Sequence, residues 1–148
     1  ATLIPKDAPN LLEGFDLIGK LKSSVGFLDG VVITGGEPTL QPDLAAFLAS
    51  IRTQTPLSIK LDTNGTHPEV LEHLFAQKLV DFVAMDVKAP LQVYPYRQMA
   101  GNMVDQEMIA NMQKSVQLIK DSGVPHEFRT TVVRPLLGER ELMEIGQE

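Results

Sequence analysis

Two hydrophobic periodicities alternate along this chain, and that alternation limits the possible folds more than any other feature of the sequence. Short apolar runs rich in β-branched residues predict buried parallel strands at Gly30–Thr34, Leu57–Leu61, Phe82–Met85 and Phe128–Val133. The runs are separated by segments with the spacing of amphipathic helices. The sequence therefore predicts an α/β fold in which strands and helices follow one another in turn.

Helical spacing is clearest in three segments between the predicted strands. Their apolar stripes consist of Leu44, Phe47, Leu48 and Ile51, of Val70, Leu71, Leu74 and Phe75, and of Met108, Ile109, Met112, Val116 and Ile119. Further helices are predicted at about Leu11–Val25 and at Glu139–Glu148. The expected helix ends are Pro42 in a first turn, a capping box of Thr66 and Glu69, and Gly123 after the third stripe.

The order of these elements narrows the topology. Because each predicted strand is followed by a helix, the chain should form βα units with right-handed crossovers. A doubly wound sheet and a sector of a (β/α) barrel both satisfy this pattern, and we expect a single domain over residues 1–148. In both architectures ligands bind at the carboxyl ends of the strands. The residues that directly follow each strand are therefore the candidates for chemistry.

Charge and composition exclude several classes of function. The 148 residues carry a formal net charge of −6 and a pI near 5.0, whereas nucleic-acid and membrane surfaces are bound by clustered Lys and Arg. No apolar run is long enough to span a membrane and no signal-peptide pattern begins the chain, so we expect a cytoplasmic protein. The absence of cysteine excludes disulfides, thiol nucleophiles, thiolate zinc sites and cysteine ligands to an iron–sulfur cluster within these residues. The three histidines, His67, His73 and His126, lack the spacing of a zinc site, so no metal ligand is predicted.

The first two strand ends offer glycines and carboxylates. Gly35 and Gly36 allow a sharp turn and close approach of a ligand to the backbone, and Glu37 adds an acceptor that suits an ammonium group. Steric relief in a tight turn would explain the glycines alone, but such a turn requires no acid, so Glu37 favours a ligand. Asp62 and Asn64 follow the second strand, where an ordinary turn explains most of the pattern, yet Asp62 should lie on the face where the first motif opens.

The third and fourth strand ends carry cations beside acids. Asp86 and Lys88 stand two residues apart on an extended segment, so their side chains should face the same site. A weak salt bridge at the rim is the alternative. Arg129 stands among apolar neighbours in a strand predicted to be buried, which makes it either a ligand-binding guanidinium or half of a core ion pair.

Convergence at one sheet edge gives these weak signals their value. Four consecutive strand ends bearing Glu, Asp, Asp with Lys, and Arg would form one pocket for a small zwitterionic molecule. Glu37 is expected near its amine, and Lys88 or Arg129 near its carboxylate. No nucleophile or general base is evident, so no catalytic residue is predicted.

The four segments, taken in order, resemble a known family. They are Thr34–Gln41 (TGGEPTLQ), Leu61–Thr66 (LDTNGT), Met85–Pro90 (MDVKAP) and Phe128–Val133 (FRTTVV). Together they resemble the radical S-adenosylmethionine (radical SAM) enzymes, and among these the glycyl-radical-enzyme activating proteins, with activators of anaerobic ribonucleoside-triphosphate reductase the most similar. The resemblance covers most of the chain, and it favours a parallel-stranded partial (β/α) barrel, a truncated radical-SAM-like core.

The resemblance implies two cofactors and two partners. A [4Fe–4S] cluster on three cysteines would bind S-adenosylmethionine, whose reductive cleavage to methionine and a 5′-deoxyadenosyl radical installs a glycyl radical on the partner enzyme. An electron donor, flavodoxin or ferredoxin, is implied as well. Carried over to this sequence, the cofactor-binding residues would be Gly35, Gly36, Glu37, Asp62, Asn64, Asp86, Lys88 and Arg129. The cofactor supplies the reactive chemistry, and the protein supplies position and electrostatics.

One departure from the family is serious, because its Cys-x-x-x-Cys-x-x-Cys loop is absent from this sequence. We therefore expect a fragment, incomplete at both ends, that forms no radical by itself. Its exposed strand edge at Gly30–Thr34 predicts association or poor solubility. Two other functions stay open: a radical SAM enzyme acting on a small molecule, such as a 7-carboxy-7-deazaguanine synthase, and a non-catalytic α/β binding module. Tyr94 and Tyr96, in a Pro-rich loop over Ala89–Gly101, would either face a partner or pack as surface loop.

Overall fold

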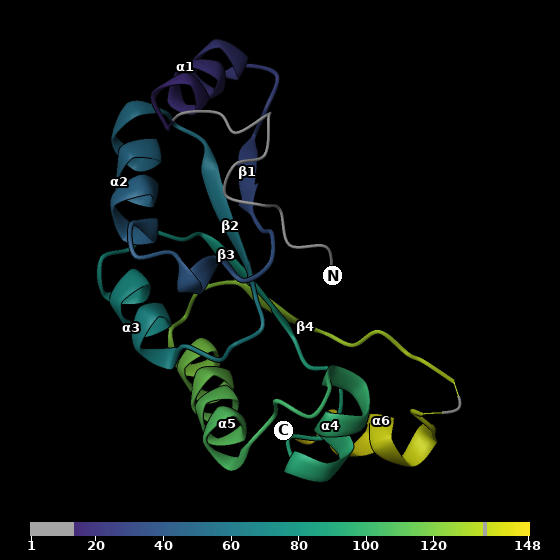
Figure 1. Cartoon of the computed structure of the whole chain (residues 1–148). Helices are drawn as coiled ribbons and strands as arrows, with labels where there is room; N and C mark the ends of the chain where they lie inside the picture. The colour runs from purple at the N-terminus through teal and green to yellow at the C-terminus, as the bar shows by residue number, and fades with distance from the viewer. Residues whose placement is uncertain (1–13, 135) are drawn as a thin grey trace.

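The four strands form one parallel sheet. The structure is a computed structural model and describes residues 14–134 and 136–148. The strands are β1 (Gly30–Ile33), β2 (Ser58–Thr63), β3 (Phe82–Asp86) and β4 (His126–Arg129), and they pair in the order β1-β2-β3-β4, every pair parallel (Figure 1). The α/β fold predicted from the alternating periodicities, and its reading as a partial (β/α) core, are thereby confirmed.

Helices occupy the connections between the strands. They are α1 (Gly14–Ser24), the short 3₁₀ helix η1 (Pro38–Leu40), α2 (Leu44–Gln54), α3 (Pro68–Ala76), α4 (Val93–Ala100), α5 (Gln106–Asp121) and α6 (Glu139–Ile145). Figure 1 shows α2, α3 and α5 on the same side of the sheet. Because a parallel strand can join the next one only by a crossover, this placement follows from the order of the elements.

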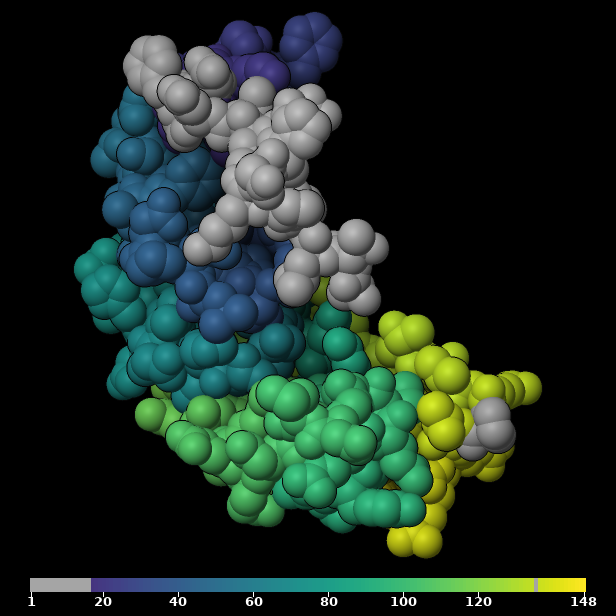
Figure 2. Space-filling view, viewed as in Figure 1, coloured from purple at the N-terminus to yellow at the C-terminus, as the bar shows by residue number. Residues whose placement is uncertain are grey.

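The two faces of the sheet differ in chemistry because successive side chains of a strand point to opposite faces. On the helix-covered face, Ile59, Leu61, Val83 and Met85 are fully buried against apolar residues of the helices. Each such side chain contributes roughly 1.5–3 kcal/mol to stability through burial. The other face carries a row of charged side chains from the three strands that follow β1: Lys60, Asp62, Asp86, Glu127 and Arg129. In Figure 2 the green segment lies across the lower part of the view, below the teal segment, with the yellow segment beside it at the lower right.

The outer strands differ from the prediction in extent and burial. The fourth strand was predicted at Phe128–Val133, but β4 begins earlier, at His126, and ends at Arg129. Phe128 is 38% exposed and Val32 of β1 is 55% exposed, so these outer strands are not buried on both faces as the sequence predicted. An edge strand has a neighbour on one side only, and apolar composition alone does not distinguish it from a central strand. The association expected from the β1 edge stays a prediction.

Several local predictions also need correction. The capping box of Thr66 and Glu69 does not form: His67 is the N-cap of α3, and Thr66 instead donates from N and Oγ1 to Asn64 Oδ1, at 2.9 and 2.7 Å. Pro42 lies before α2, whose N-cap is Asp43. The prediction for Gly123 is confirmed, because this glycine follows α5 with a φ of +71°, in the left-handed region.

The segment predicted as a Pro-rich loop contains a helix, α4. Its tyrosines have different environments: Tyr94 is 73% exposed, and Tyr96 is buried at 3%. The Tyr96 hydroxyl accepts a hydrogen bond from Lys88 N at 3.2 Å. Burial, partly offset by this hydrogen bond and reinforced by the carboxylate of Asp86, raises the pKa of Tyr96.

Candidate functional site

One cleft at the carboxyl ends of the strands contains every residue that the sequence singled out for ligand binding. Its volume is about 100 Å³. The lining residues are Thr34, Gly35, Gly36, Glu37, Asp62, Thr63, Asn64, Asp86, Lys88 and Arg129. The parallel topology accounts for this convergence, because it brings four strand ends that are distant in the sequence to one edge.

The turn after β1 is shaped by glycine and by an acid. Gly35 has φ +140°, which L-residues with a side chain rarely adopt, and no atom lies within 4 Å of the position that a Cβ would occupy. The backbone conformation at position 35 therefore requires glycine, and the missing side chain also leaves the cleft open. The turn continues into η1, whose N-cap is Glu37.

Glu37 connects two strand ends. Its Oε1 accepts from Thr39 N at 3.1 Å, Thr39 Oγ1 at 2.6 Å and Thr63 Oγ1 at 2.8 Å, and its Oε2 accepts from Asn64 N at 2.7 Å. The side chain is 9% exposed. The expectation that this turn requires no acid was wrong, because the carboxylate caps η1 and fastens it to the end of β2. Oε2, with one hydrogen bond, is the atom of Glu37 that still has capacity for a ligand donor.

Gly65 allows the turn after β2 to pack closely over the sheet. Its φ is +75°, and a Cβ there would lie 2.7 Å from Met85 Sδ and closer still to Met85 Cε. Its carbonyl accepts from the buried Ser115 Oγ of α5 at 2.7 Å. These contacts hold the turn close to the sheet, and Asn64, which precedes Gly65 in this turn, lines the cleft.

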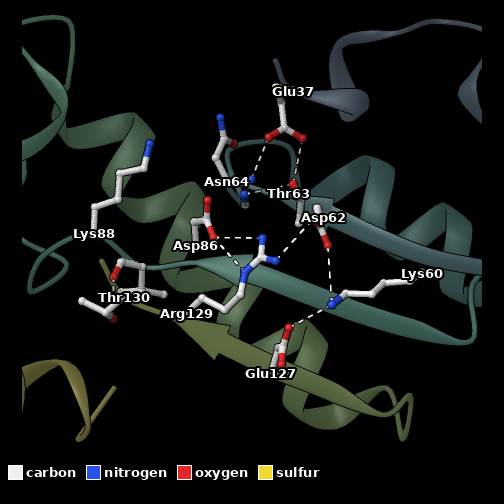
Figure 3. Close-up of polar contacts among 12 residues, drawn as sticks. Glu37, Lys60, Asp62, Thr63, Asn64, Asp86, Lys88, Glu127, Arg129 and Thr130 are labelled. Carbon is white, nitrogen blue, oxygen red and sulfur yellow. Dashed lines mark hydrogen bonds and ion pairs between the residues drawn. The ribbon is translucent and has the colours of Figure 1, made fainter. Parts of the chain in front are cut away.

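Arg129 bridges two carboxylates instead of facing the cleft alone (Figure 3). Its NH1 lies 3.2 Å from Asp62 Oδ2, and its Nε and NH2 each lie 3.0 Å from Asp86 Oδ1. Partial burial disfavours the charged guanidinium, but Asp86 and Asp62 outweigh it and raise the pKa of Arg129. Its side chain is 38% exposed, so Arg129 belongs to a half-exposed edge strand and not to a buried one. Of the two predicted roles, the ion pair is the one that the structure contains.

The row of charged side chains on the face not covered by helices continues beyond Arg129, Asp62 and Asp86. Lys60 Nζ lies 3.0 Å from Glu127 Oε1 and 3.9 Å from Asp62 Oδ1. The buried Asp62 Oδ1 accepts no hydrogen bond from any residue that the structure describes. An unsatisfied carboxylate oxygen of this kind is costly unless a ligand donates to it.

Lys88 is the cation of the cleft that forms no ion pair with the described residues. It lies two residues after Asp86, both side chains line the cleft, and Val87 between them is 2% exposed, as the predicted alternation requires. The cleft therefore offers carboxylate oxygens on one side and an ammonium group on the other. This arrangement is complementary to an amino acid's ammonium and carboxylate groups.

Sequence reasoning missed the hydroxyls that support the site. Thr39 and Thr63 both donate to Glu37, and both are buried. A signal for Thr63 was present, because a polar residue at a core-facing position of a strand needs a partner nearby. The partner itself comes from 26 residues away and is visible only in the folded chain.

Within residues 14–134 and 136–148, no group of three His, Asp or Glu side chains is arranged to hold a metal ion. No helix in the same part of the chain is long and apolar enough to cross a membrane.

Comparison with known proteins gives three matches. The sequence model of the radical SAM superfamily matches residues 7–145. A Methanocaldococcus jannaschii protein provisionally named a glycyl-radical enzyme activating enzyme is 40% identical over 122 residues, which is 82% of this chain and 50% of that protein. The 7-carboxy-7-deazaguanine synthase of Neisseria meningitidis serogroup B is 35% identical over 74 residues, covering 50% of this chain and 30% of the synthase. The chain thus spans half the length, or less, of these relatives.

Proposed function

This chain belongs to the radical SAM superfamily, and from that premise we propose that it forms the S-adenosylmethionine-binding part of a protein that activates a glycyl radical enzyme. The observation that carries the proposal is the convergence of the eight predicted ligand-binding residues on one cleft. The likeness to the M. jannaschii protein over 82% of the chain favours an activating protein within the superfamily.

The cleft fits the amino-acid end of S-adenosylmethionine. Glu37 Oε2 and the unsatisfied Asp62 Oδ1 are acceptors for the ammonium group, together with the open backbone at Gly35 and Gly36. Lys88 is the counterion for the carboxylate. Arg129 is ion-paired with both Asp62 and Asp86 and holds them in place, so its role here is positioning.

The remaining groups have supporting roles. Asn64 presents its side chain to the cleft while its backbone N–H is held by Glu37. Asp86 forms an ion pair with Arg129 and also lines the cleft, where it is the third carboxylate beside Glu37 and Asp62. These residues bind and orient, and no described residue of the cleft is assigned a proton-transfer step.

S-adenosylmethionine held by these residues would, on one-electron reduction, supply methionine and a 5′-deoxyadenosyl radical; transfer of a hydrogen atom from a glycine of the partner would then give 5′-deoxyadenosine and the glycyl radical. The iron–sulfur cluster that delivers this electron in the family does not fit this chain, because its 148 residues include no cysteine. We propose that the chain by itself forms no radical. The partner proposed is anaerobic ribonucleoside-triphosphate reductase, with flavodoxin or ferredoxin as electron donor in the cytoplasm.

The binding step is tested by calorimetric titration with S-adenosylmethionine. Changing Lys88 to Met should weaken binding about tenfold, because it removes a charge-assisted contact worth about 1.4 kcal/mol or more. Lys114→Met, on the exposed side of α5, is the matched control and should bind as the parent protein does. Equal affinities of the two variants would refute the assignment of Lys88.

The activity is tested with a protein that contains this chain together with cluster-binding cysteines. After anaerobic incubation with reductant, S-adenosylmethionine and the reductase, the expected result is a glycyl radical signal in electron paramagnetic resonance. Turnover of a small heterocyclic substrate without that signal would favour the alternative suggested by the synthase relative. Binding of S-adenosylmethionine without cleavage would favour a non-catalytic module.

A further inference from the structure

The phenol of Tyr96 contacts the backbone of the residue that serves as the cation of the cleft. Tyr96 belongs to α4, is 3% exposed and packs in the apolar core. Its hydroxyl accepts a hydrogen bond from Lys88 N at 3.2 Å. A phenylalanine ring would fill the same core without burying a hydroxyl, and a buried hydroxyl is costly unless it is hydrogen-bonded. The contact with Lys88 therefore distinguishes Tyr96 from an ordinary core residue.

The hydrogen bond from Lys88 lies where the chain leaves the sheet. Val87 is still held by the end of β4, because its N–H donates to Arg129 O at 2.8 Å and its carbonyl accepts from Thr130 Oγ1 at 2.8 Å. One residue further on, the N–H of Lys88 donates to Tyr96 instead. The helix α4 thus takes over from β4 in fixing the backbone. Contacts from both elements set the position from which the Lys88 side chain extends.

The ammonium group of Lys88 depends on this support. Lys88 forms no ion pair with the described residues, and in Figure 3 no dashed line joins its ammonium group to another residue drawn there. Because the aliphatic stem of lysine is flexible, an ammonium group without an acidic partner is directed mainly by the backbone that carries it. Tyr96 and Lys88 also line one hollow of about 390 Å³, and Lys88 and Asn64 line the cleft as well. Tyr96 therefore lies at the edge of the sheet where the ligand-binding groups gather.

The Tyr96 hydroxyl also retains a proton of its own. Burial, together with the carboxylate of Asp86, raises the pKa of Tyr96, so the hydroxyl stays protonated at neutral pH. The O–H finds no acceptor among the described residues, because its one hydrogen bond with them is the one that it accepts from Lys88. Tyr96 can thus affect a ligand in two ways, through Lys88 or by donating to the ligand directly. The contact with Lys88 is the one that the structure contains, and the inference is built on it.

Together these contacts assign a role to the hydroxyl. We propose that Tyr96 is a positioning residue for recognition of the ligand's carboxylate: its hydroxyl holds the backbone of Lys88 and thereby directs the Lys88 ammonium group at that carboxylate. Tyr96 then favours ligands with a free carboxylate over otherwise identical ligands without one. The inference rests on the proposed function, since the carboxylate is that of S-adenosylmethionine.

Calorimetric titration with S-adenosylmethionine tests the role of the hydroxyl. Tyr96→Phe keeps the ring and removes only the hydroxyl, and it should weaken binding about threefold to fivefold, less than the loss of about tenfold expected for Lys88→Met. Tyr94→Phe is the matched control on the same helix. The Tyr94 hydroxyl also accepts one hydrogen bond, from Gln98 Nε2 at 3.1 Å, but Tyr94 is 73% exposed. This control should bind within about twofold of the parent protein.

The double variant of Lys88→Met with Tyr96→Phe tests whether Tyr96 acts through Lys88. A residue that only directs the ammonium group contributes nothing once that group is gone, so the double variant should bind as Lys88→Met alone does. A hydrogen bond from Tyr96 directly to the ligand would instead make the two losses multiply.

Decarboxylated S-adenosylmethionine gives a second readout, because it keeps the ammonium group, the sulfonium and the nucleoside. Tyr96→Phe should change the affinity for this ligand by less than about twofold. A purely structural defect in Tyr96→Phe would weaken the binding of both ligands alike.

Three results would overturn the inference: equal affinities of Tyr96→Phe and Tyr94→Phe, a further loss in the double variant equal to that of Tyr96→Phe alone, or equal losses for the two ligands. If S-adenosylmethionine binds the parent protein and Lys88→Met weakens it, the proposed function stands although the assignment of Tyr96 falls. Absence of binding by the parent protein would overturn the proposed function as well.

Discussion

The hydrogen bonds of Glu37 predict a large loss of stability for the isosteric change Glu37→Gln. The carboxylate accepts four hydrogen bonds, three at Oε1 and one at Oε2. An amide has one acceptor oxygen and one donor nitrogen. If its nitrogen takes the Oε2 position, it meets the N–H of Asn64. If its nitrogen takes the Oε1 position, the hydroxyls of Thr39 and Thr63 can turn to accept, but Thr39 N–H loses its acceptor.

The magnitude follows from this count. In either orientation one buried backbone N–H is left without an acceptor, which costs about 1–3 kcal/mol, and the surviving hydrogen bonds lose the strengthening that a charged acceptor provides. We expect a total loss of about 2–4 kcal/mol in the free energy of unfolding. For a chain of this length that corresponds to a fall of about 5–12 °C in Tm.

Urea denaturation followed by circular dichroism measures the loss, and Glu127→Gln is the matched control. Glu127 is 44% exposed and contacts Lys60 at 3.0 Å on the open face, so the same substitution there should cost about 0–1 kcal/mol. Hydrogen exchange should accelerate in Glu37→Gln at the N–H of Asn64 or at that of Thr39, whichever loses its acceptor. Equal denaturation midpoints for the two variants would refute the view that Glu37 fastens the strand ends together.

Two further predictions concern the supports of the site. Gly65→Ala should cost about 1–3 kcal/mol more than Gly123→Ala, because the two glycines have similar φ values of +75° and +71° but only Gly65 has Met85 where the Cβ would stand, and urea midpoints of the two variants give the comparison. Tyr96→Phe should cost about 1 kcal/mol at neutral pH, since Lys88 N loses its acceptor. Because the folded-state pKa of Tyr96 is raised above 10.0, the unfolded chain releases the phenol proton first, so this contribution is complete below that pH and is lost as the pH rises through the folded-state pKa. Unfolding measured from neutral to strongly alkaline pH should show that loss in the parent protein and a smaller one in Tyr96→Phe; identical slopes would contradict the linkage.

Much of the fold was predictable because it depends on local pattern. The period of apolar residues identified the four strands and the helices between them, and parallel pairing follows once each strand is succeeded by a helix. Strand limits and burial were less accurate at β4, because an edge strand and a central strand have similar composition. The capping box at Thr66 failed because the hydroxyl and N–H of Thr66 found a nearer acceptor in Asn64.

The sequence predicted which residues line the site, but it did not predict which of their side chains pair with one another. Topological rules place the ends of parallel strands at one edge, so Glu37, Asp62, Lys88 and Arg129 were expected together before any coordinates. These rules do not specify which side chains become hydrogen-bond or ion-pair partners. Arg129 was predicted to bind either a ligand or an acid, and only the register of β3 with β4, which sets it opposite Asp86, decides between them.

The sequence by itself determined the class of fold, the edge where polar groups gather and their net chemistry, because these depend on residue type and on short-range periodicity. Tertiary structure alone decided that Glu37 fastens two strand ends and that Lys88 is left as the cation of the cleft without a described acidic partner. Each of these depends on distances between atoms that are far apart in the chain. Hydrogen bonds and ion pairs form only within about 3 Å, and the order of residues does not directly specify such distances.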